Sequence, residues 1–401
     1  MTLGRPSKLQ KTAEDEWKCP VSNKAAPSTR PTAKDLVQPI VEEVKLGCHR
    51  QDGKNPISLA TADPTMPHIP PCTKAMEAVV QSTLYKPHAA GYTHASGTPE
   101  ARRAIAMHHS FPEHQLGATH AIVTNGCSGA LDLALTALLD PGSSILVPLP
   151  GFPLYEEIAT SSGANVIHYK LDPKRQWECD MNHLEAIMAS NATADVRAVL
   201  INNPSTHGSV FSEKHLEQLV GFALKHRLPI VSDEIYGDLT FGANKFHPIA
   251  QIAARHGRRV PVITTSGLSK QFMVPGWRIG WVTFQDNVHG SLQQVEQGAH
   301  RLAQKTHGVS RLTQAAIPTL LSASTPGLAD WKEKHRVVLE RQGMLLCSGL
   351  NDCVGLKVGP PQGSMYAIVQ LHPQCLRDDI QNDMDFALRL VQEENVFVLP
   401  G

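Results

Sequence analysis

The sequence predicts an α/β fold in which a large domain is joined to a smaller one. The first observation is a series of short apolar runs, typical of buried strands, that end in small or polar residues. The second is that one such run, at 121–124, leads through a small-residue turn at 125–129 into a helical pattern at 130–138. The third is a helical pattern between about residues 293 and 350. A chain of 401 residues is long enough for two substantial cores.

The composition argues against several classes of function. Lysine plus arginine equals aspartate plus glutamate, with 37 of each, so we expect neither nucleic acid nor an anionic membrane as a partner. No apolar stretch approaches the roughly 20 residues that span a bilayer. The eight cysteines show no metal-binding spacing, which favours reduced thiols and a cytoplasmic protein. Residues 1–16 are polar and lack the apolar core of a secretory signal, so we expect a disordered tail.

The apolar runs give the expected order of strands. Strands are predicted at 57–60, 121–124, 144–148, 198–201, 228–232, 260–264 and 281–284, and helices at 36–46 and 384–391. Open α/β sheets place their ligands at the carboxyl ends of strands. Asn203 and Asp233 follow two of these strands and are therefore candidate site residues. A solvated strand-end carboxylate is the alternative for Asp233, but apolar or small residues precede it and Ile235 follows.

The turn at 125–129 is a candidate anion site. A strand, a turn of small residues and a helix start bring free backbone N–H groups and the helix dipole to one spot. Cys127 and Ser128 are the predicted phosphate contacts in this turn. The turn is not a Walker loop, because no Gly-Lys-Ser/Thr follows it. The alternative is that Ser128 only caps the helix.

Lys270 and Arg278 form the most informative pair of charged residues. Lys270 ends a short polar turn, and Arg278 follows eight residues later, past a Pro-Gly break. An amine that attacks an aldehyde must be neutral, so it needs a desolvated or cation-flanked site. The planar fork of an arginine suits a phosphate dianion. The alternative is a pair of solvated surface charges, against which the apolar neighbours Phe272, Trp277 and Trp281 argue.

The run from Thr264 to Trp281, which includes Pro-Gly-Trp-Arg-Ile-Gly-Trp, resembles the lysine segment of class I aminotransferases. These are pyridoxal 5'-phosphate (PLP) enzymes of fold type I, and the likeness is greatest to their tyrosine aminotransferase group. The resemblance also covers Asp233-Glu234-Ile235-Tyr236-Gly237-Asp238. It implies a mostly parallel central sheet between helices in a large cofactor-binding domain, and a smaller α+β domain.

The resemblance implies domain limits as well. Residues 17–75 would form an N-terminal arm and part of the small domain, and residues 76–305 the large domain. Residues 306–401 would form a linking helix and the rest of the small domain, in which the run at 360–369 resembles the Gly-x-Met-Tyr strand of the family. Family members continue beyond Pro400-Gly401 into a segment whose arginine binds the substrate carboxylate, and we expect no arginine of this sequence to take that position. Ala62 stands where the family has a glycine beside the substrate carboxylate.

Roles for the candidate residues follow from the resemblance. Lys270 would hold PLP as an aldimine, and Arg278 would grip its phosphate. Asp233 would pair with the pyridine nitrogen, and Tyr236 would bond the phenolic oxygen. Phe152 would stack on the ring of PLP, and packing of Phe152 in the core is the alternative.

Two further roles depend on loops. The family loop after the strand at 198–201 carries a second asparagine that bonds the phenolic oxygen, and this sequence lacks it. Asn203 would take its role through a shifted loop. Tyr92 matches a tyrosine that reaches the PLP phosphate of the neighbouring subunit, which implies a homodimer with shared active sites. A half-buried loop aromatic is the alternative for Tyr92.

The resemblance predicts transamination between an aromatic amino acid and a 2-oxo acid such as 2-oxoglutarate, in two half-reactions. Three alternatives stay open. The first is a broad-specificity or alanine-type aminotransferase, and the second is a PLP-dependent carbon–sulfur lyase. The third is a PLP-binding protein with little transaminase activity, which Ala62, the altered loop after 198–201 and the absent arginine favour.

Overall fold

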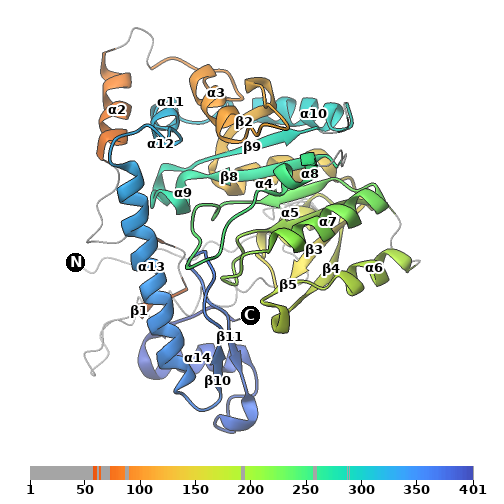
Figure 1. The fold of residues 1–401 in the computed structure, drawn as a ribbon, viewed down its shortest axis with the longest axis vertical. Coiled ribbons are helices and arrows are strands. Elements are labelled where there is room, and N and C mark those ends of the chain that lie inside the picture. The colour runs from red at the N-terminus through yellow and green to blue at the C-terminus, as the bar shows by residue number, and fades with distance from the viewer. Residues whose placement is uncertain are drawn as a thin grey trace, which may run out of the picture.

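An eight-stranded sheet forms the centre of the protein (Figure 1). The structure is a computed structural model that describes residues 57–60, 63–64, 73–85, 90–190, 195–255, 260–286, 288 and 290–400. Across the sheet the order is β2 (Ala121–Asn125), β9 (Ile279–Gln285), β8 (Val262–Gly267), β7 (Ile230–Asp233), β6 (Val196–Asn202), β3 (Ser144–Leu149), β4 (Asn165–Asp172) and β5 (Glu178–Cys179). All strands run in one direction except β9 and β5. The predicted α/β fold with a mostly parallel sheet is therefore confirmed.

Helices cover both faces of this sheet. On one face lie α4 (Gly126–Leu138), α5 (Leu154–Ser161) and α10 (Gln293–Ala303), and on the other lie α6 (Met181–Ala189), α7 (Glu213–His226) and α8 (Ile249–Ala254). Successive strand residues point to opposite faces. In β6, Ala198 and Leu200 pack with α4 and α5, whereas Val199 and Ile201 pack with α7 and α8. Both faces are buried, which is why this strand is apolar without alternation.

A third apolar cluster lies at the β2 edge of the sheet. It joins Ile105 and Val123 to Phe272, Trp281 and Leu320. The helices of this region are α2 (Thr73–Leu84), α3 (Pro99–His108), α9 (Leu268–Gln271), α11 (Arg311–Gln314) and α12 (Ile317–Leu320). Short 3-10 turns occur at Ala118–His120, Pro173–Arg175, Pro275–Trp277, Gln304–Thr306 and Pro373–Cys375. This cluster includes Ile279 and Trp281 of β9, the strand that follows Arg278, so it supports one side of the candidate site.

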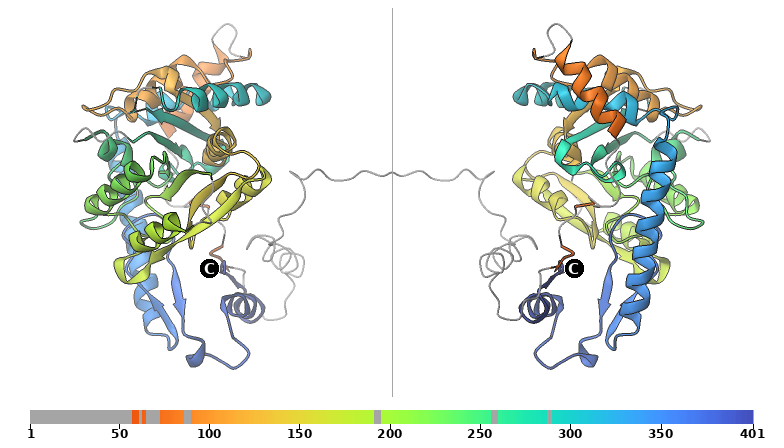
Figure 2. Two further views of the ribbon diagram at one scale, coloured as in Figure 1. Left: turned by 90° about the vertical axis from the view of Figure 1, so that its right-hand side faces the viewer. Right: turned by 90° about the vertical axis from the view of Figure 1, so that its left-hand side faces the viewer.

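The last elements of the chain, from residue 356 to residue 397, form a separate group below the sheet (Figure 1). The long helix α13 (Leu328–Asn351) runs from the sheet to this group, as both side views show (Figure 2). The group contains β10 (Leu356–Val358), β11 (Val369–Leu371), α14 (Asp383–Glu394) and β12 (Val396–Phe397). β1 (Ile57–Ser58) pairs in parallel with β12. The domain limits given above stay a prediction.

Several predicted elements need correction. The predicted strand at 360–369 is wrong, because only β11 begins at Val369 and the residues before it bond to loops instead of a strand. The helical pattern between 293 and 350 is not continuous, since Gly308 and Gly327 adopt positive φ angles of 87° and 74° that break it. β4 and β5 were not predicted at all. The predicted tail, the helix at 36–46 and Ala62 lie outside the described residues.

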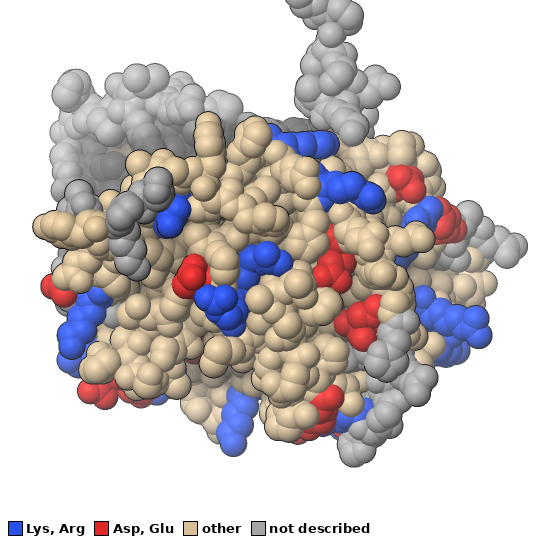
Figure 3. Space-filling model, turned by 90° about the horizontal axis from the view of Figure 1, so that it is seen from above, with Lys and Arg blue, Asp and Glu red and all other residues tan. Residues whose placement is uncertain are grey.

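The surface agrees with the balanced composition. Lysine and arginine side chains are interspersed with aspartate and glutamate on the face seen from above (Figure 3). Neither sign forms a continuous patch on that face. Within the described part of the chain, no helix combines the length and the apolar character needed to cross a membrane.

Candidate active site

The strand directions bring the predicted site residues to one edge of the sheet, the edge formed by the carboxyl ends of its parallel strands. β2, β6, β7 and β8 are parallel, so their carboxyl ends share that edge, and the antiparallel β9 begins there. Registers fix the alignment, because Asn202 pairs with Asp233, Asp233 with Thr265, and Gly267 with Gly280. This edge therefore carries the start of α4, Asn203, Asp233, Lys270 and Arg278. Ligands of open α/β sheets bind at such an edge.

Gly126, Arg278 and Gly280 form what we call the rim of the site. The N–H of Gly126 donates to the carbonyl of Arg278 at 3.0 Å, which joins the start of α4 to the start of β9. A Cβ on Gly126 would lie 2.3 Å from Nη2 of Arg278, and one on Gly280 would lie 2.2 Å from the carbonyl carbon of Gly126. Only glycines allow this approach. The exposed guanidinium thus lies against a helix start, an arrangement suited to an anion.

The two predicted phosphate contacts in α4 face different surroundings. Ser128 is exposed in the first turn of the helix. The helix begins at Gly126 with Asn125 as its N-cap, so the alternative that Ser128 caps it is wrong. The thiol of Cys127 is buried and donates to Oδ1 of Asp233 at 3.5 Å. Burial raises the pKa of this thiol well above its usual value, and its hydrogen bond is made to the carboxylate of Asp233.

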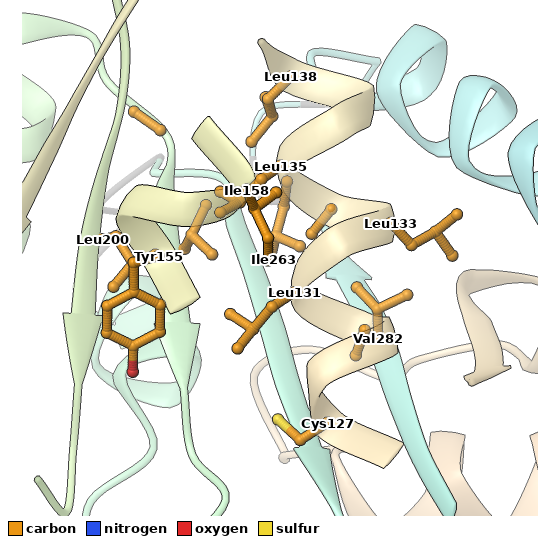
Figure 4. Packing of buried hydrophobic residues seen from close by; sticks show 14 of the residues in the cluster. Cys127, Leu131, Leu133, Leu135, Leu138, Tyr155, Ile158, Leu200, Ile263 and Val282 are labelled. Carbon is orange, nitrogen blue, oxygen red and sulfur yellow. The ribbon is translucent and has the colours of Figure 1, made fainter. Parts of the chain in front are cut away.

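Tyr155, Asp233, Tyr236 and Tyr366 form what we call the floor of the site. Asp233 ends β7 and is 3% exposed. Its Oδ2 accepts the hydroxyl of Tyr155 at 2.7 Å, and its Oδ1 accepts the N–H of Ile235 at 3.3 Å. Tyr155 and Cys127 lie toward the same end of the packed cluster between α4 and α5 (Figure 4).

Among the described residues, the carboxylate of Asp233 has no positively charged partner. Burial raises its pKa, although the bonds from Tyr155, Ile235 and Cys127 act in the opposite direction. No lysine, arginine or histidine of the described chain forms an ion pair with it. A buried carboxylate without a counter-ion is costly, so this one fits a ligand that supplies a positive charge.

Tyr236 completes the floor beside Asp233. It is 4% exposed, and its ring meets Tyr366 edge to face, with centroids 5.8 Å apart at 84°. Burial raises the pKa of Tyr236 well above its usual value, and the neighbouring Tyr366 raises it further. Its hydroxyl is therefore a stable hydrogen-bond donor at neutral pH.

Lys270 lies in the short helix α9, directly after β8. Burial lowers its pKa to about 8, the nearby Arg278 lowers it further, and Asp63 acts in the opposite direction. The side chain of the next residue, Gln271, donates through Nε2 to the carbonyl of Glu234 at 3.4 Å. α9 is thereby tied to the end of β7, and Lys270 has the lowered pKa that a nucleophilic amine needs.

The remaining predicted residues differ in exposure. Phe152 is 40% exposed and meets Tyr155 edge to face at 5.6 Å, so the alternative of core packing is wrong. Tyr92 is 92% exposed, so the alternative of a half-buried loop aromatic is wrong. The centroid of its ring lies 6.0 Å from that of His307. Asn203 is 2% exposed, and its Oδ1 accepts the N–H of Phe211 at 2.8 Å. The Nδ2 group of Asn203 is the one that can serve a ligand.

Two residues of the floor and one buried neighbour were missed from sequence. Tyr155 follows Phe152 by three residues, in the first turn of α5, so its nearness to Phe152 in the sequence was a usable signal. Glu234 is buried beside Asp233, and burial raises its pKa to about 8. Tyr366 comes from a distant segment, and nothing in its neighbourhood in the sequence pointed to the floor.

Comparisons with known proteins agree with this geometry. The family model described as aminotransferase class I and II matches residues 54–401, so the chain belongs to that family. Members of the family depend on PLP, and the protein is a PLP-dependent aminotransferase that acts on amino and oxo acids.

Individual relatives show which members of the family this chain is similar to. The chain is 35% identical over 388 residues to tyrosine aminotransferase of Homo sapiens, covering 94% of this chain and 82% of the relative. It is 32% identical over 394 residues to S-alkyl-thiohydroximate lyase of Arabidopsis thaliana, covering 96% and 81% of the two chains. The crystal structure of tyrosine aminotransferase from Leishmania infantum superposes with a TM-score of 0.77 at 32% identity, covering 87% and 84%.

The described residues fit PLP. The rim offers a guanidinium and backbone N–H groups to a phosphate, and the Cβ positions excluded at Gly126 and Gly280 keep this approach open. The uncompensated carboxylate of Asp233 suits a protonated ring nitrogen. The half-buried amine of Lys270, with its lowered pKa, suits an aldehyde.

Proposed function

We propose that the protein transfers the amino group of an aromatic amino acid, tyrosine above all, to a 2-oxo acid such as 2-oxoglutarate. The observation that carries this proposal is that Lys270 and Asp233 lie at the same edge of the sheet. The pKa of Lys270 is lowered, and the pKa of Asp233 is raised. Relatives named tyrosine aminotransferase support the aromatic substrate. A cytoplasmic location stays a prediction.

Each residue has a defined task in this proposal. Bound PLP supplies the electron sink that stabilises the carbanion. Lys270 Nζ accepts the α-proton of the amino acid and delivers it in the opposite half-reaction, for which its pKa of about 8 is well placed. Asp233 holds the ring nitrogen protonated, and Tyr236 donates its hydroxyl to the phenolic oxygen. Arg278 holds the phosphate, and a 2-oxo acid reverses the steps.

The proposal is tested with purified protein, PLP and single amino donors. We expect tyrosine without any oxo acid to convert the visible absorbance of the bound cofactor to that of its amino form. Adding 2-oxoglutarate should restore the first spectrum and release the keto acid of tyrosine. Alanine is the comparison donor, and a faster reaction with alanine would favour the alanine-type alternative.

The Lys270→Ala variant is the control for chemistry at this site. Removing a catalytic group of this kind lowers kcat by about 10⁴-fold or more. Lys270→Arg keeps the positive charge but cannot supply a neutral amine near neutral pH, so we expect it to be equally inactive. Full activity in either variant would overturn the proposal.

A carbon–sulfur lyase is the second candidate. It is favoured by the likeness to S-alkyl-thiohydroximate lyase, which extends over 96% of this chain. A lyase would release ammonia from a sulfur-containing amino acid without any oxo acid, whereas a transaminase would not. Bound PLP with neither product would point to a protein that binds the cofactor without transaminase activity.

The shared active site of a homodimer is also part of the proposal. It is supported by Tyr92, a large aromatic side chain that is 92% exposed. If Tyr92 serves the partner, mixing inactive Tyr92→Ala with inactive Lys270→Ala chains should restore one complete site in each mixed dimer. Tyr85→Ala, which removes another exposed tyrosine, is the matched control and should be active alone. Mixed dimers without recovered activity would count against shared sites.

A further inference from the structure

The side chain of Tyr155 is completely buried, and its hydroxyl donates to the carboxylate of the floor. Tyr155 lies in the first turn of α5 and is 0% exposed. Its hydroxyl donates to Oδ2 of Asp233 at 2.7 Å, a distance typical of a bond from a hydroxyl to a charged oxygen. Such bonds are about twice as strong as those between neutral groups. Tyr155 therefore favours the ionised form of Asp233.

The other oxygen of Asp233 has its own donors. Oδ1 accepts the N–H of Ile235 at 3.3 Å and the thiol of Cys127 at 3.5 Å. A thiol is a weak donor, so the bond from Tyr155 is the strongest of these contacts. The two side-chain donors come from α4 and α5, which lie on the same face of the sheet. Donors on both oxygens hold the carboxylate in one orientation.

Burial and hydrogen bonding act in opposite directions on Asp233. Burial raises its pKa, whereas the bond from Tyr155 lowers it, as do the donors to its other oxygen. Burial also raises the pKa of Tyr155 well above its usual value, and Asp233 raises it further, so the phenol keeps its proton at neutral pH. Glu234 and Tyr236, on the segment of Asp233 itself, are two further titratable groups near it. The hydroxyl of Tyr155 is thus a permanent donor that opposes protonation of Asp233.

We infer that Tyr155 is a positioning residue that keeps Asp233 ionised before the cofactor arrives, so that the carboxylate can pair with the protonated ring nitrogen of PLP even at acidic pH. The inference rests on the proposed role of Asp233. A neutral carboxylic acid in the floor could not form this ion pair, and PLP would bind more weakly. Tyr155 therefore sets the lowest pH at which the protein retains its cofactor.

The test is the pH dependence of cofactor affinity, measured with pyridoxamine 5'-phosphate on the cofactor-free full chain between about pH 5 and 8. This amino form has the same ring nitrogen and phosphate but no aldehyde, so its binding does not involve attack by Lys270. The affinity should fall as the pH falls through the pKa of Asp233 in the cofactor-free chain, by up to about tenfold per pH unit.

Tyr155→Phe removes the strongest donor to Asp233. We therefore expect the fall in affinity to begin about one to two pH units higher than in the wild type, the equivalent of one hydrogen bond to a charged group. At about pH 8 the difference between the two proteins should be smallest. Cys127→Ala, which removes the weak donor, should move the fall in the same direction by about half a unit.

Two controls separate this effect from packing. Tyr169→Phe removes another buried hydroxyl, one that donates to the carbonyl of Leu200 at 2.8 Å, from the cluster on the opposite face of the sheet. This variant should keep the pH profile of the wild type. In an Asp233→Asn background the titrating carboxylate is absent, so Tyr155→Phe should no longer alter the pH profile.

The outcomes distinguish this inference from the proposed function. A pH profile of Tyr155→Phe that coincides with that of the wild type, or a shift that persists in the Asp233→Asn background, overturns the inference and leaves transamination intact. If Tyr155→Phe does not fold, Cys127→Ala decides, because an unmoved profile would show that these donors do not hold Asp233 ionised. A wild-type protein that transfers no amino group to an oxo acid overturns the proposed function itself.

Discussion

The rim and the floor lie at the same sheet edge but are built by different means. The rim uses two glycines, main-chain groups and one exposed arginine, and its strands β2 and β9 are direct neighbours. The floor uses buried side chains from α5 and from the end of β7, together with the half-buried Tyr366 from a segment near the C-terminus. The rim binds an anion through a charge at the surface, whereas the floor acts in surroundings from which water is excluded.

This contrast predicts different sensitivities for the two parts. The exposed guanidinium of the rim interacts with an anion through water, so salt screens its effect. In the floor, low dielectric surroundings strengthen each hydrogen bond and shift each pKa. Changes to the rim should therefore alter cofactor affinity, and changes to the floor should alter the rate of the reaction.

Asp233→Asn should show the largest effect on the floor. An asparagine cannot hold the ring nitrogen protonated, and loss of such an electrostatic contact lowers kcat by about 10²–10³-fold. The cofactor-free variant should unfold at the same or a higher temperature, because a buried uncompensated carboxylate has been removed. Steady-state kinetics and thermal unfolding measure the two effects. A reduced kcat accompanied by a lower melting temperature would indicate a structural role instead.

Glu234, a buried neighbour of the floor residue Asp233, should make the stability of the fold depend on pH. Burial raises its pKa from 4.5 to about 8, so the folded chain keeps a proton that the unfolded chain releases. The stability that this proton provides is complete below about pH 4.5 and is lost as the pH rises towards 8. The free energy of unfolding should fall in this window by up to about 1.4 kcal/mol per pH unit.

Glu234→Gln is the variant that checks this dependence. It keeps an acceptor for the hydroxyl of Ser232, which donates to Oε1 of Glu234 at 2.9 Å, but it cannot titrate. Denaturant unfolding of the cofactor-free chain between about pH 5 and 8 should then show a flatter profile than the wild type. Equal slopes in the two proteins would contradict the assignment to Glu234.

Arg278→Lys should produce a smaller effect confined to the rim. A lysine keeps the charge but loses the planar fork, so PLP should bind about tenfold more weakly while kcat at saturation changes little. Equilibrium titration with PLP at two salt concentrations measures this. A large fall in kcat with unchanged affinity would show that the rim and the floor do not divide their tasks in this way.

Phe152→Leu should have the smallest effect. The exposed ring lies beside Tyr155, and losing an aromatic stack costs about 0.5–1.5 kcal/mol, which is at most about tenfold in PLP affinity. Phe152→Tyr keeps an aromatic face and should bind PLP as the wild type does. Weak binding by both variants would point to a disturbed loop and not to stacking.

The same contrast explains how much of the site the sequence revealed. The α/β fold, seven strands, the turn before α4 and the position of Arg278 could be predicted, because turns and strand ends are local patterns. The close approach of Gly280 to this turn was not predicted. The start of α4 at Gly126 extends the predicted helix by four residues. Tyr366 could not be predicted, since its contact with Tyr236 joins segments 130 residues apart. β4 was missed because it contains the half-buried His168 and the exposed Lys170, which weaken an apolar signal.

The turn between β8 and β9 bears on whether the protein accepts the phosphorylated or the unphosphorylated form of pyridoxal. Its two ends are fixed by the pairing of Gly267 with Gly280, so the sheet sets the separation of Lys270 and Arg278 before any ligand arrives. The turn therefore holds Lys270 and Arg278 at a fixed separation. A pyridoxal molecule that has not been phosphorylated would reach the amine and leave the guanidinium without an anion. Because of this spacing, we expect the protein to bind pyridoxal 5'-phosphate more tightly than unphosphorylated pyridoxal.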